Sequence, residues 1–142
     1  MTVVDPVWNA VELVEAIHQR QIAEHGGGDG VRNEGLLESA LARPQHLFAY
    51  GGGDVEVPAL AASYAYGIAR NHPFVDGNKR TGAVICEVFL ELNGYVLLPD
   101  DPELYPVFLA LAAGELEEDQ LADWLRRHSR SDEVSEPDSG YG

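Results

Sequence analysis

Lysine is almost absent from this chain of 142 residues. Lys79 is its one lysine among nine basic residues, and 24 acidic residues bring the formal net charge to −15. An acidic surface of this kind repels phosphate backbones, which argues against nonspecific or direct binding of nucleic acid. A nucleotide would therefore have to be held by a local cluster of cations, with the help of a divalent metal ion.

Cysteine is equally scarce, because Cys86 is the only one. A disulfide framework is thereby excluded, and the apolar run around Cys86 predicts a buried, inert thiol. The N-terminus has neither a basic region nor a long apolar stretch, so we expect no secretory signal. No apolar run approaches the roughly 18 residues of a membrane span. These absences predict a cytoplasmic protein with no membrane partner.

Helical periodicity dominates what is present, and little of the chain alternates with the period of two that strands show. The length suits one domain with a substantial core. We expect an all-α fold, a compact six-helix bundle over residues 1–130, followed by an acidic, disordered tail over residues 131–142. The first expected helix spans residues 7–24, the second runs from an N-cap at Asn33 to a stop before Pro44, and the third starts at Pro58. The fourth follows the motif described below and ends at Asn93. The fifth spans residues 107–113 with Pro106 near its start, and the sixth runs from Glu117 to Arg127.

Residues 46–57 do not fit a helix. Two short runs with apolar residues flank three consecutive glycines, a pattern typical of a small β-hairpin or an extended flap. An irregular loop between two helices is the alternative. Because this stretch precedes the helix that leads into the motif, we expect it to lie next to the active-site loop, where its edge would pair with the backbone of a target protein.

Residues 72–82, with the sequence HPFVDGNKRTG, carry most of the chemical information. The proline after His72 disfavours helical conformation there, which puts His72 at the end of a helix or in a loop. Its neutral imidazole could accept a proton from a hydroxyl group at cellular pH. A histidine satisfied within the core is the alternative. Phe74 is the expected anchor that fixes the loop to the apolar interior.

The second half of the motif predicts a phosphate site. Asp76 could hold Mg²⁺ through one carboxylate while phosphate oxygens and water complete the shell; capping the next helix is its alternative role. Gly77 and Asn78 allow a tight turn whose N–H groups point at one anion at the positive end of a helix. Lys79 adds a point charge and Arg80 a planar fork that fits phosphate oxygens.

No other part of the sequence competes with this motif. The remaining histidines lack metal-ligand spacing, and most are expected at the surface: His18, His25, His46 and His128. The glycine run over residues 26–30 lacks the lysine of a Walker loop, so a plain linker is expected there.

The motif resembles the signature of the Fic/Doc superfamily, His-Pro-Phe-x-x-Gly-Asn-Gly-Arg-x-x-Arg. The matching positions are His72, Pro73, Phe74, Gly77, Asn78 and Arg80. The helical layout and the short length resemble the death-on-curing (Doc) branch. The resemblance implies His72 as the base, Asp76 as the magnesium ligand, and Asn78, Lys79 and Arg80 as phosphate binders, with ATP and Mg²⁺ bound.

Two positions depart from the adenylylating members of this superfamily. Lys79 replaces their second glycine, and Ala83 replaces their final arginine. The Asn-Lys-Arg version resembles Doc toxins, which bind ATP the other way round and transfer its γ-phosphate. The resemblance implies a growth-inhibiting toxin with elongation factor Tu as its target, neutralised by a small antitoxin that is partly disordered when free. Transfer of AMP to a protein hydroxyl and a catalytically silent, antitoxin-binding subunit are the alternatives.

Overall fold

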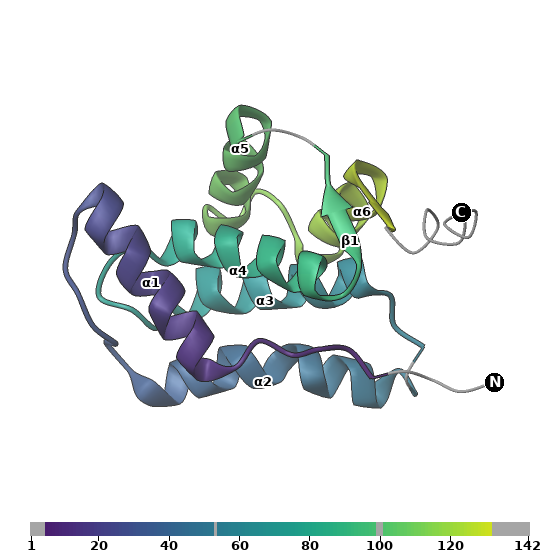
Figure 1. Cartoon of the computed structure of the whole chain (residues 1–142), viewed down its shortest axis with the longest axis horizontal. Helices are drawn as coiled ribbons and strands as arrows, with labels where there is room; N and C mark the ends of the chain where they lie inside the picture. The colour runs from purple at the N-terminus through teal and green to yellow at the C-terminus, as the bar shows by residue number, and fades with distance from the viewer. Residues whose placement is uncertain (1–4, 53, 99–100, 132–142) are drawn as a thin grey trace, which may run out of the picture.

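The computed structural model describes residues 5–52, 54–98 and 101–131, and in them the chain forms six helices and one pair of short strands (Figure 1). The expected all-α, six-helix fold is confirmed. The elements are α1 (Val11–His25), α2 (Glu34–Tyr50), α3 (Val57–Asn71), α4 (Asn78–Leu92), β1 (Tyr95–Leu97), α5 (Asp101–Ala112), α6 (Glu118–His128) and β2 (Ser129–Ser131). Of the predicted tail, Ser131 ends β2, and residues 132–142 lie outside the described part.

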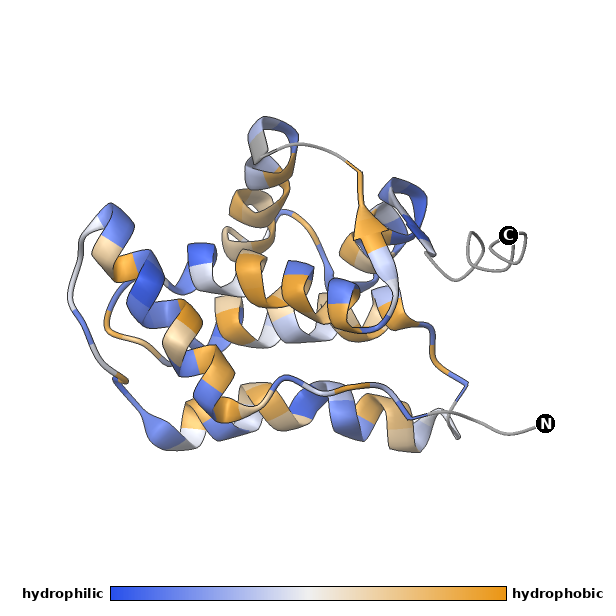
Figure 2. Ribbon diagram, in the orientation of Figure 1, coloured by the Kyte–Doolittle hydropathy of each residue, from blue (hydrophilic) through white to orange (hydrophobic). Residues whose placement is uncertain are grey.

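Helix α3 forms the centre of the core. Ten of its fifteen residues are buried, and it packs against α2, α4 and α6. Its Tyr64 meets Phe89 of α4 with ring centroids 5.0 Å apart. Helices α1, α2 and α4 instead mix apolar and polar residues along their lengths (Figure 2), as expected for helices with one buried face. No helix in the described part is long and apolar enough to span a bilayer.

Small residues bring α3 close to its neighbours. A Cβ atom built on Gly67 of α3 would lie 3.2 Å from both Cα and Cβ of Ala40 in α2, and 3.3 Å from the carbonyl oxygen of Ala40. A Cβ atom on Gly82 of α4 would be in ordinary contact instead, 3.6 Å from the nearest atoms of Ala65 and Ile68. Substitution by alanine should therefore have opposite effects on the stability of the fold at the two glycines.

We expect Gly67→Ala to destabilise the fold and Gly82→Ala to leave it unchanged or slightly more stable. Alanine gains up to about 1 kcal/mol over glycine within a helix, whereas overpacking costs about 1 to 3 kcal/mol. The atoms facing Gly67 belong mostly to the backbone of a packed helix and cannot move aside alone, so the cost exceeds the gain there. Thermal unfolding followed by circular dichroism checks both variants. A Gly67→Ala protein that melts at or above the wild-type temperature would contradict the close contact of α2 with α3.

Helix α2 continues through Pro44 to Tyr50, so the predicted stop before Pro44 is wrong. Leu37, Leu41 and Pro44 are buried, and Phe48 packs against the core. These positions continue one inward stripe at helical spacing beyond the proline. Burial of that stripe outweighs the backbone hydrogen bond that the proline removes.

The hairpin or flap predicted over residues 46–57 is not formed. Residues 46–50 are helical, and a short loop leads on to α3, as in the alternative reading. This loop meets the N-terminal end of α3, whereas the motif follows the C-terminal end (Figure 1). The fifteen residues of α3 place about 22 Å between them, at about 1.5 Å per residue. The predicted position beside the active-site loop is therefore wrong as well.

The two strands of the described part lie outside residues 46–57. β1 pairs with β2 in antiparallel register, with Val96 opposite Arg130.

Two helices start at other residues than predicted. Helix α1 begins at Val11 instead of residue 7, and α5 begins at Asp101 instead of residue 107, so that Pro106 lies inside it. The reason in α5 is again an inward stripe at helical spacing that the proline does not interrupt. Its buried members are Leu104, Phe108 and Leu111.

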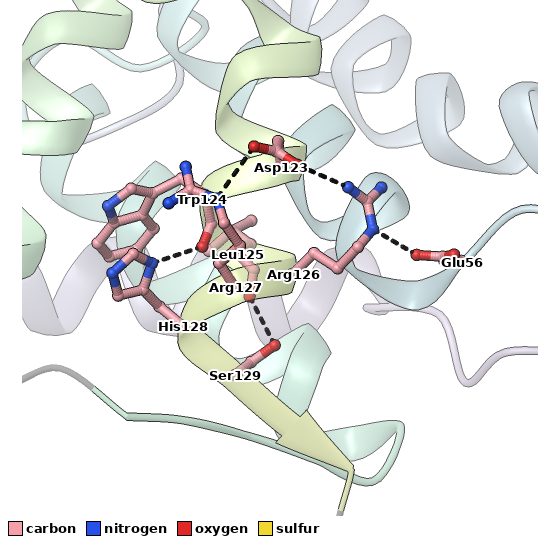
Figure 3. A network of polar contacts seen from close by, with 8 residues as sticks. All are labelled: Glu56, Asp123, Trp124, Leu125, Arg126, Arg127, His128 and Ser129. Carbon is pink, nitrogen blue, oxygen red and sulfur yellow. Dashed lines mark hydrogen bonds and ion pairs between the residues drawn. The ribbon is translucent and has the colours of Figure 1, made fainter.

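Helix α6 has the charged ends that the sequence predicts. Glu117 and Gln120 form a reciprocal capping box at its start. Near its end, Arg126 contacts Asp123 at 3.2 Å and Glu56, the N-cap residue of α3, at 2.7 Å (Figure 3). These ion pairs are exposed, so each contributes at most about 1 kcal/mol. The pair of Arg126 with Glu56 joins the end of α6 to the start of α3.

Candidate active site

The motif forms the loop between α3 and α4. His72 follows the last residue of α3 with φ 51° and ψ 55°, and its N–H group donates to the carbonyl of Ile68. It is the one residue other than glycine with positive φ among the described residues. The prediction that His72 leaves the helix is confirmed. A left-handed residue stores about 1 to 2 kcal/mol of strain, and such strain is commonly found at functional sites.

Phe74 anchors this loop in the core, as predicted. Its side chain is 1% exposed. Its backbone is held by the side chain of Asn78, whose Oδ1 accepts from the Phe74 N–H at 3.0 Å and whose Nδ2 donates to the Phe74 carbonyl at 3.0 Å. Asn78 is itself 6% exposed. These two bonds fix the loop shape before any ligand binds.

His18 of α1 packs against the motif loop, so the prediction of a surface position for His18 is wrong. Its side chain is 2% exposed, its ring stacks on Phe74 with centroids 3.9 Å apart, and its Nε2 donates to the carbonyl of Asp76 at 2.8 Å. The sequence did carry a signal, because His18 falls four residues after Val14 and four before Ile22, on the apolar face of α1.

The segment over residues 26–33 runs along the motif loop, although the sequence predicts a linker. The N–H groups of Arg32 and Asn33 both donate to the carbonyl of Pro73, at 2.7 and 3.1 Å, and the Val75 N–H donates to Gly30 at 3.1 Å. The Arg32 side chain adds bonds to the carbonyls of Asn71 and His72 at 3.0 and 2.8 Å. This segment therefore positions the turn that carries His72.

Glycine is required where this segment comes closest. A Cβ atom on Gly28 would lie 2.8 Å from Cγ1 of Val75, and one on Gly27 would lie 3.1 Å from Cβ of Asp76. The close approach lets the Gly28 N–H donate to Oδ2 of Asp76 at 2.6 Å. No side chain caps α4, whose N-cap is Gly77, so capping is not the role of Asp76. Its other oxygen is left for a ligand.

All six predicted site residues line one pocket of about 310 Å³. The pocket also contains Val75 and Tyr105; the predicted members are His72, Asp76, Gly77, Asn78, Lys79 and Arg80. It opens on the uncapped N-terminus of α4, where the backbone N–H groups and the helix dipole favour an anion. The carboxylate of Asp76 suits Mg²⁺, which typically takes one or two protein carboxylates and completes its shell with phosphate and water.

The two cations differ in their surroundings. Both Lys79 and Arg80 are exposed, but the Arg80 guanidinium lies 5.6 Å from the ring centroid of Tyr105 in α5, a cation–π contact that restricts its orientation. Tyr105 is a site residue that the sequence did not predict, because no local pattern links it to a motif 25 residues earlier.

The contact of His72 with Asn78 favours one tautomer of the imidazole ring. Nδ1 of His72 lies 3.3 Å from Nδ2 of Asn78. Because Oδ1 of Asn78 accepts from Phe74, Nδ2 donates and Nδ1 of His72 accepts, so the neutral ring carries its proton on Nε2. The contact is long for a hydrogen bond, and its loss on substrate binding costs little.

The cysteine does not take part. Cys86 is fully buried within α4, and burial raises the pKa of its thiol above the ordinary value. The reactive thiolate is therefore not formed at cellular pH, which agrees with the inert thiol that the sequence predicts.

Comparison with known proteins agrees with the geometry. Residues 8–90 match the Fic/DOC family. A protein kinase doc of Escherichia phage P1 is 36% identical over 116 residues, which cover 82% of this chain and 90% of the phage protein. A toxin Doc of Mycolicibacterium smegmatis (strain ATCC 700084 / mc(2)155) is 46% identical over 79 residues, 53% of this chain and 58% of that toxin.

Proposed function

The chain belongs to the Fic/DOC family, and from this premise we propose that it is a Doc-type toxin that transfers the γ-phosphate of ATP to a Ser or Thr hydroxyl of a target protein. The observation that carries the proposal is the single pocket in which a histidine, a carboxylate, two cations and a free helix N-terminus meet. These are the groups that phosphoryl transfer needs for positioning and charge stabilisation.

Four residues of the pocket have roles in this reaction. The ring nitrogen of His72 that carries no proton accepts the proton of the attacking hydroxyl, a bond forms from the hydroxyl oxygen to the γ-phosphorus, and the bond to the bridging oxygen breaks to release ADP. Lys79, Arg80 and the first N–H groups of α4 hold the phosphate oxygens. Asp76 would hold Mg²⁺, which neutralises charge on the phosphates when it is bound. His72 then releases its proton to water.

Two residues favour γ-phosphate transfer over transfer of AMP. Lys79 lines the phosphate pocket in place of the glycine of adenylylating relatives, and its side chain occupies space near the α4 N-terminus. Ala83 supplies no second arginine for the outer phosphates. Protein adenylylation remains the second candidate function, because His72 and the helix N-terminus would serve it equally well.

We further propose elongation factor Tu as the target and an antitoxin as the regulator. A groove between the start of α1 and α2 supports the proposal of an antitoxin as the regulator. Its apolar residues include Trp8, Leu37 and Leu41, and its rim is acidic, with Glu15, Glu34 and Glu38. Such a surface fits a partner segment that presents an apolar face flanked by basic residues.

Labelled ATP tests the proposed function. The chain is incubated with Mg²⁺ and purified elongation factor Tu, and separately with cell extract, using ATP labelled at either the α or the γ position. Transfer of γ label alone to a protein is the expected result. Transfer of α label would establish adenylylation instead. Transfer of neither label to any protein would leave a catalytically silent subunit and overturn the proposal.

We expect Lys79→Gly to lower γ-label transfer and to produce weak α-label transfer, because it restores the space that the lysine fills. The exposed position at the start of α4 limits the cost in stability to about 1 kcal/mol. Lys79→Ala is the matched control, which removes the charge without introducing glycine. Label transfer from both forms of ATP is the measurement. Unchanged γ-label transfer by Lys79→Gly would show that this lysine does not decide the chemistry.

A further inference from the structure

His18 is the one acidic or basic side chain that is buried in the described part of the chain, and the reaction as proposed does not use it. Its ring lies on the buried face of α1 and is 2% exposed. Burying a polar group is costly unless the group is hydrogen-bonded, and an apolar residue would fill the same position without that cost. The partner of the bond that His18 makes therefore indicates what this histidine does.

That partner is the backbone of Asp76. Nε2 of His18 donates to the Asp76 carbonyl at 2.8 Å. Stacking on Phe74 fixes the direction of the ring, with centroids 3.9 Å apart and planes inclined by 8°. A second contact comes from the turn after α1, where the Gly28 N–H donates to Oδ2 of Asp76 at 2.6 Å. The backbone and the carboxylate of Asp76 are thus each held by a bond from the same stretch of chain.

We propose that His18 is a positioning residue that sets how tightly the active-site pocket binds Mg²⁺, and that it acts through Asp76. The inference rests on the proposed function, because it assumes that Asp76 holds the metal ion of a bound nucleotide. A partner that orients a metal ligand typically contributes about 10- to 100-fold to metal affinity. The ligand that is already oriented has less conformational freedom to lose when the ion binds.

The geometry at Asp76 makes its orientation important. The bond from Gly28 occupies one carboxylate oxygen and leaves the other for the metal ion. Mg²⁺ demands near-ideal octahedral geometry, with water and phosphate oxygens as its other ligands. Loss of the His18 bond frees the peptide group of Asp76 to rotate, and the carboxylate moves with it. A small rotation of this one carboxylate therefore weakens binding of the ion.

Substitution separates the two properties of His18. Glutamine can place an amide N–H group close to the position of Nε2, so His18→Gln keeps the donor and gives up the stacked ring. His18→Phe keeps a stacked ring and gives up the donor. The matched control for stability is Val14→Ala. Val14 is fully buried one turn earlier on the same face of α1, and its apolar side chain offers no donor to Asp76.

The test measures the affinity of the full chain for ATP by calorimetry, once with saturating Mg²⁺ and once with EDTA. The ratio of the two affinities reports the contribution of the metal ion and requires no catalysis. His18→Phe should lower this ratio by about tenfold or more, and Asp76→Asn should lower it at least as much. His18→Gln should keep most of the wild-type ratio. Val14→Ala should lower the melting temperature and leave the ratio unchanged.

A double variant shows whether His18 acts through Asp76. Combining His18→Phe with Asp76→Asn should give a ratio no lower than that of Asp76→Asn alone. Non-additive losses of this kind identify two residues that serve one interaction. A further loss in the double variant would mean that His18 affects the metal ion by another route, which overturns the inference.

Other results would overturn the inference as well. They are a wild type that binds ATP no more tightly with Mg²⁺ than with EDTA, an unchanged ratio in His18→Phe or Asp76→Asn, and equal losses in His18→Phe and Val14→Ala. Equal losses in His18→Phe and His18→Gln would show that the ring matters and the donor does not. All of these leave the proposed function intact if the wild type still transfers γ label. A wild type that keeps its ratio but transfers no label overturns the proposed function alone.

Discussion

His72→Asn should lower the rate of label transfer by a factor of about 10² to 10⁴, the usual cost of losing a general base. Asparagine has no group that accepts a proton near neutral pH, yet it tolerates the left-handed conformation that His72 adopts better than most residues do. It can also accept the hydrogen bond that Asn78 directs at His72. The substitution therefore removes the chemistry and keeps the loop. Initial rates with γ-labelled ATP provide the measurement.

The choice of asparagine matters for the interpretation. Alanine in a left-handed conformation costs about 1 to 2 kcal/mol, so His72→Ala could lose activity through a distorted loop. We expect the melting temperature of His72→Asn to match that of the wild type. His46→Asn, at an exposed position of α2, is the matched control and should retain full activity. A His72→Asn protein that transfers label at near the wild-type rate would show that another group accepts the proton.

That the six predicted residues line one pocket could be expected from the sequence, because the motif is local. Residues 72–80 are close in the chain, and one turn between two helices brings their side chains to the same pocket. Pro73 predicts that His72 leaves the right-handed helix, although the left-handed conformation that His72 adopts is not the extended one that a following proline favours. The anchoring of the loop follows from Phe74. A linear motif of this kind specifies its own geometry, so the expectations for these residues needed no information from the rest of the chain.

The supports of the site could not be predicted in the same way, because they are distant in sequence. His18 bonds to a residue 58 positions away, and the segment over residues 26–33 pairs with a loop about 40 to 45 positions later. Tyr105 reaches Arg80 only through the packing of α5 on α4. The errors in α2 and around Pro106 have a different cause, since tertiary burial of an apolar stripe there outweighs the local preference of proline.

Arg80 should be nearly as important as the base. We expect both Arg80→Ala and Arg80→Lys to lower the rate of label transfer by a factor of about 10² to 10³, as for the loss of one preorganised charge contact. Lysine keeps the charge but loses the planar fork that grips two phosphate oxygens and stacks on Tyr105. Arg127→Lys, at an exposed position of α6 paired with Asp123, is the matched control and should have no effect on the rate.

The two Arg80 variants should change different kinetic constants, even where their rates of label transfer are similar. Charge alone attracts ATP to the pocket, and this attraction matters in a chain with a net charge of −15, whose overall field opposes an anion. Arg80→Ala should therefore raise KM for ATP as well as lower kcat. Arg80→Lys should lower kcat with a smaller change in KM, because orientation of the transferred phosphate is realised mainly in the transition state. Added salt should raise KM of the wild type for the same reason, since it screens exposed cations. An Arg80→Lys protein with an unchanged kcat would mean that the pocket needs a positive charge at this position and no fork.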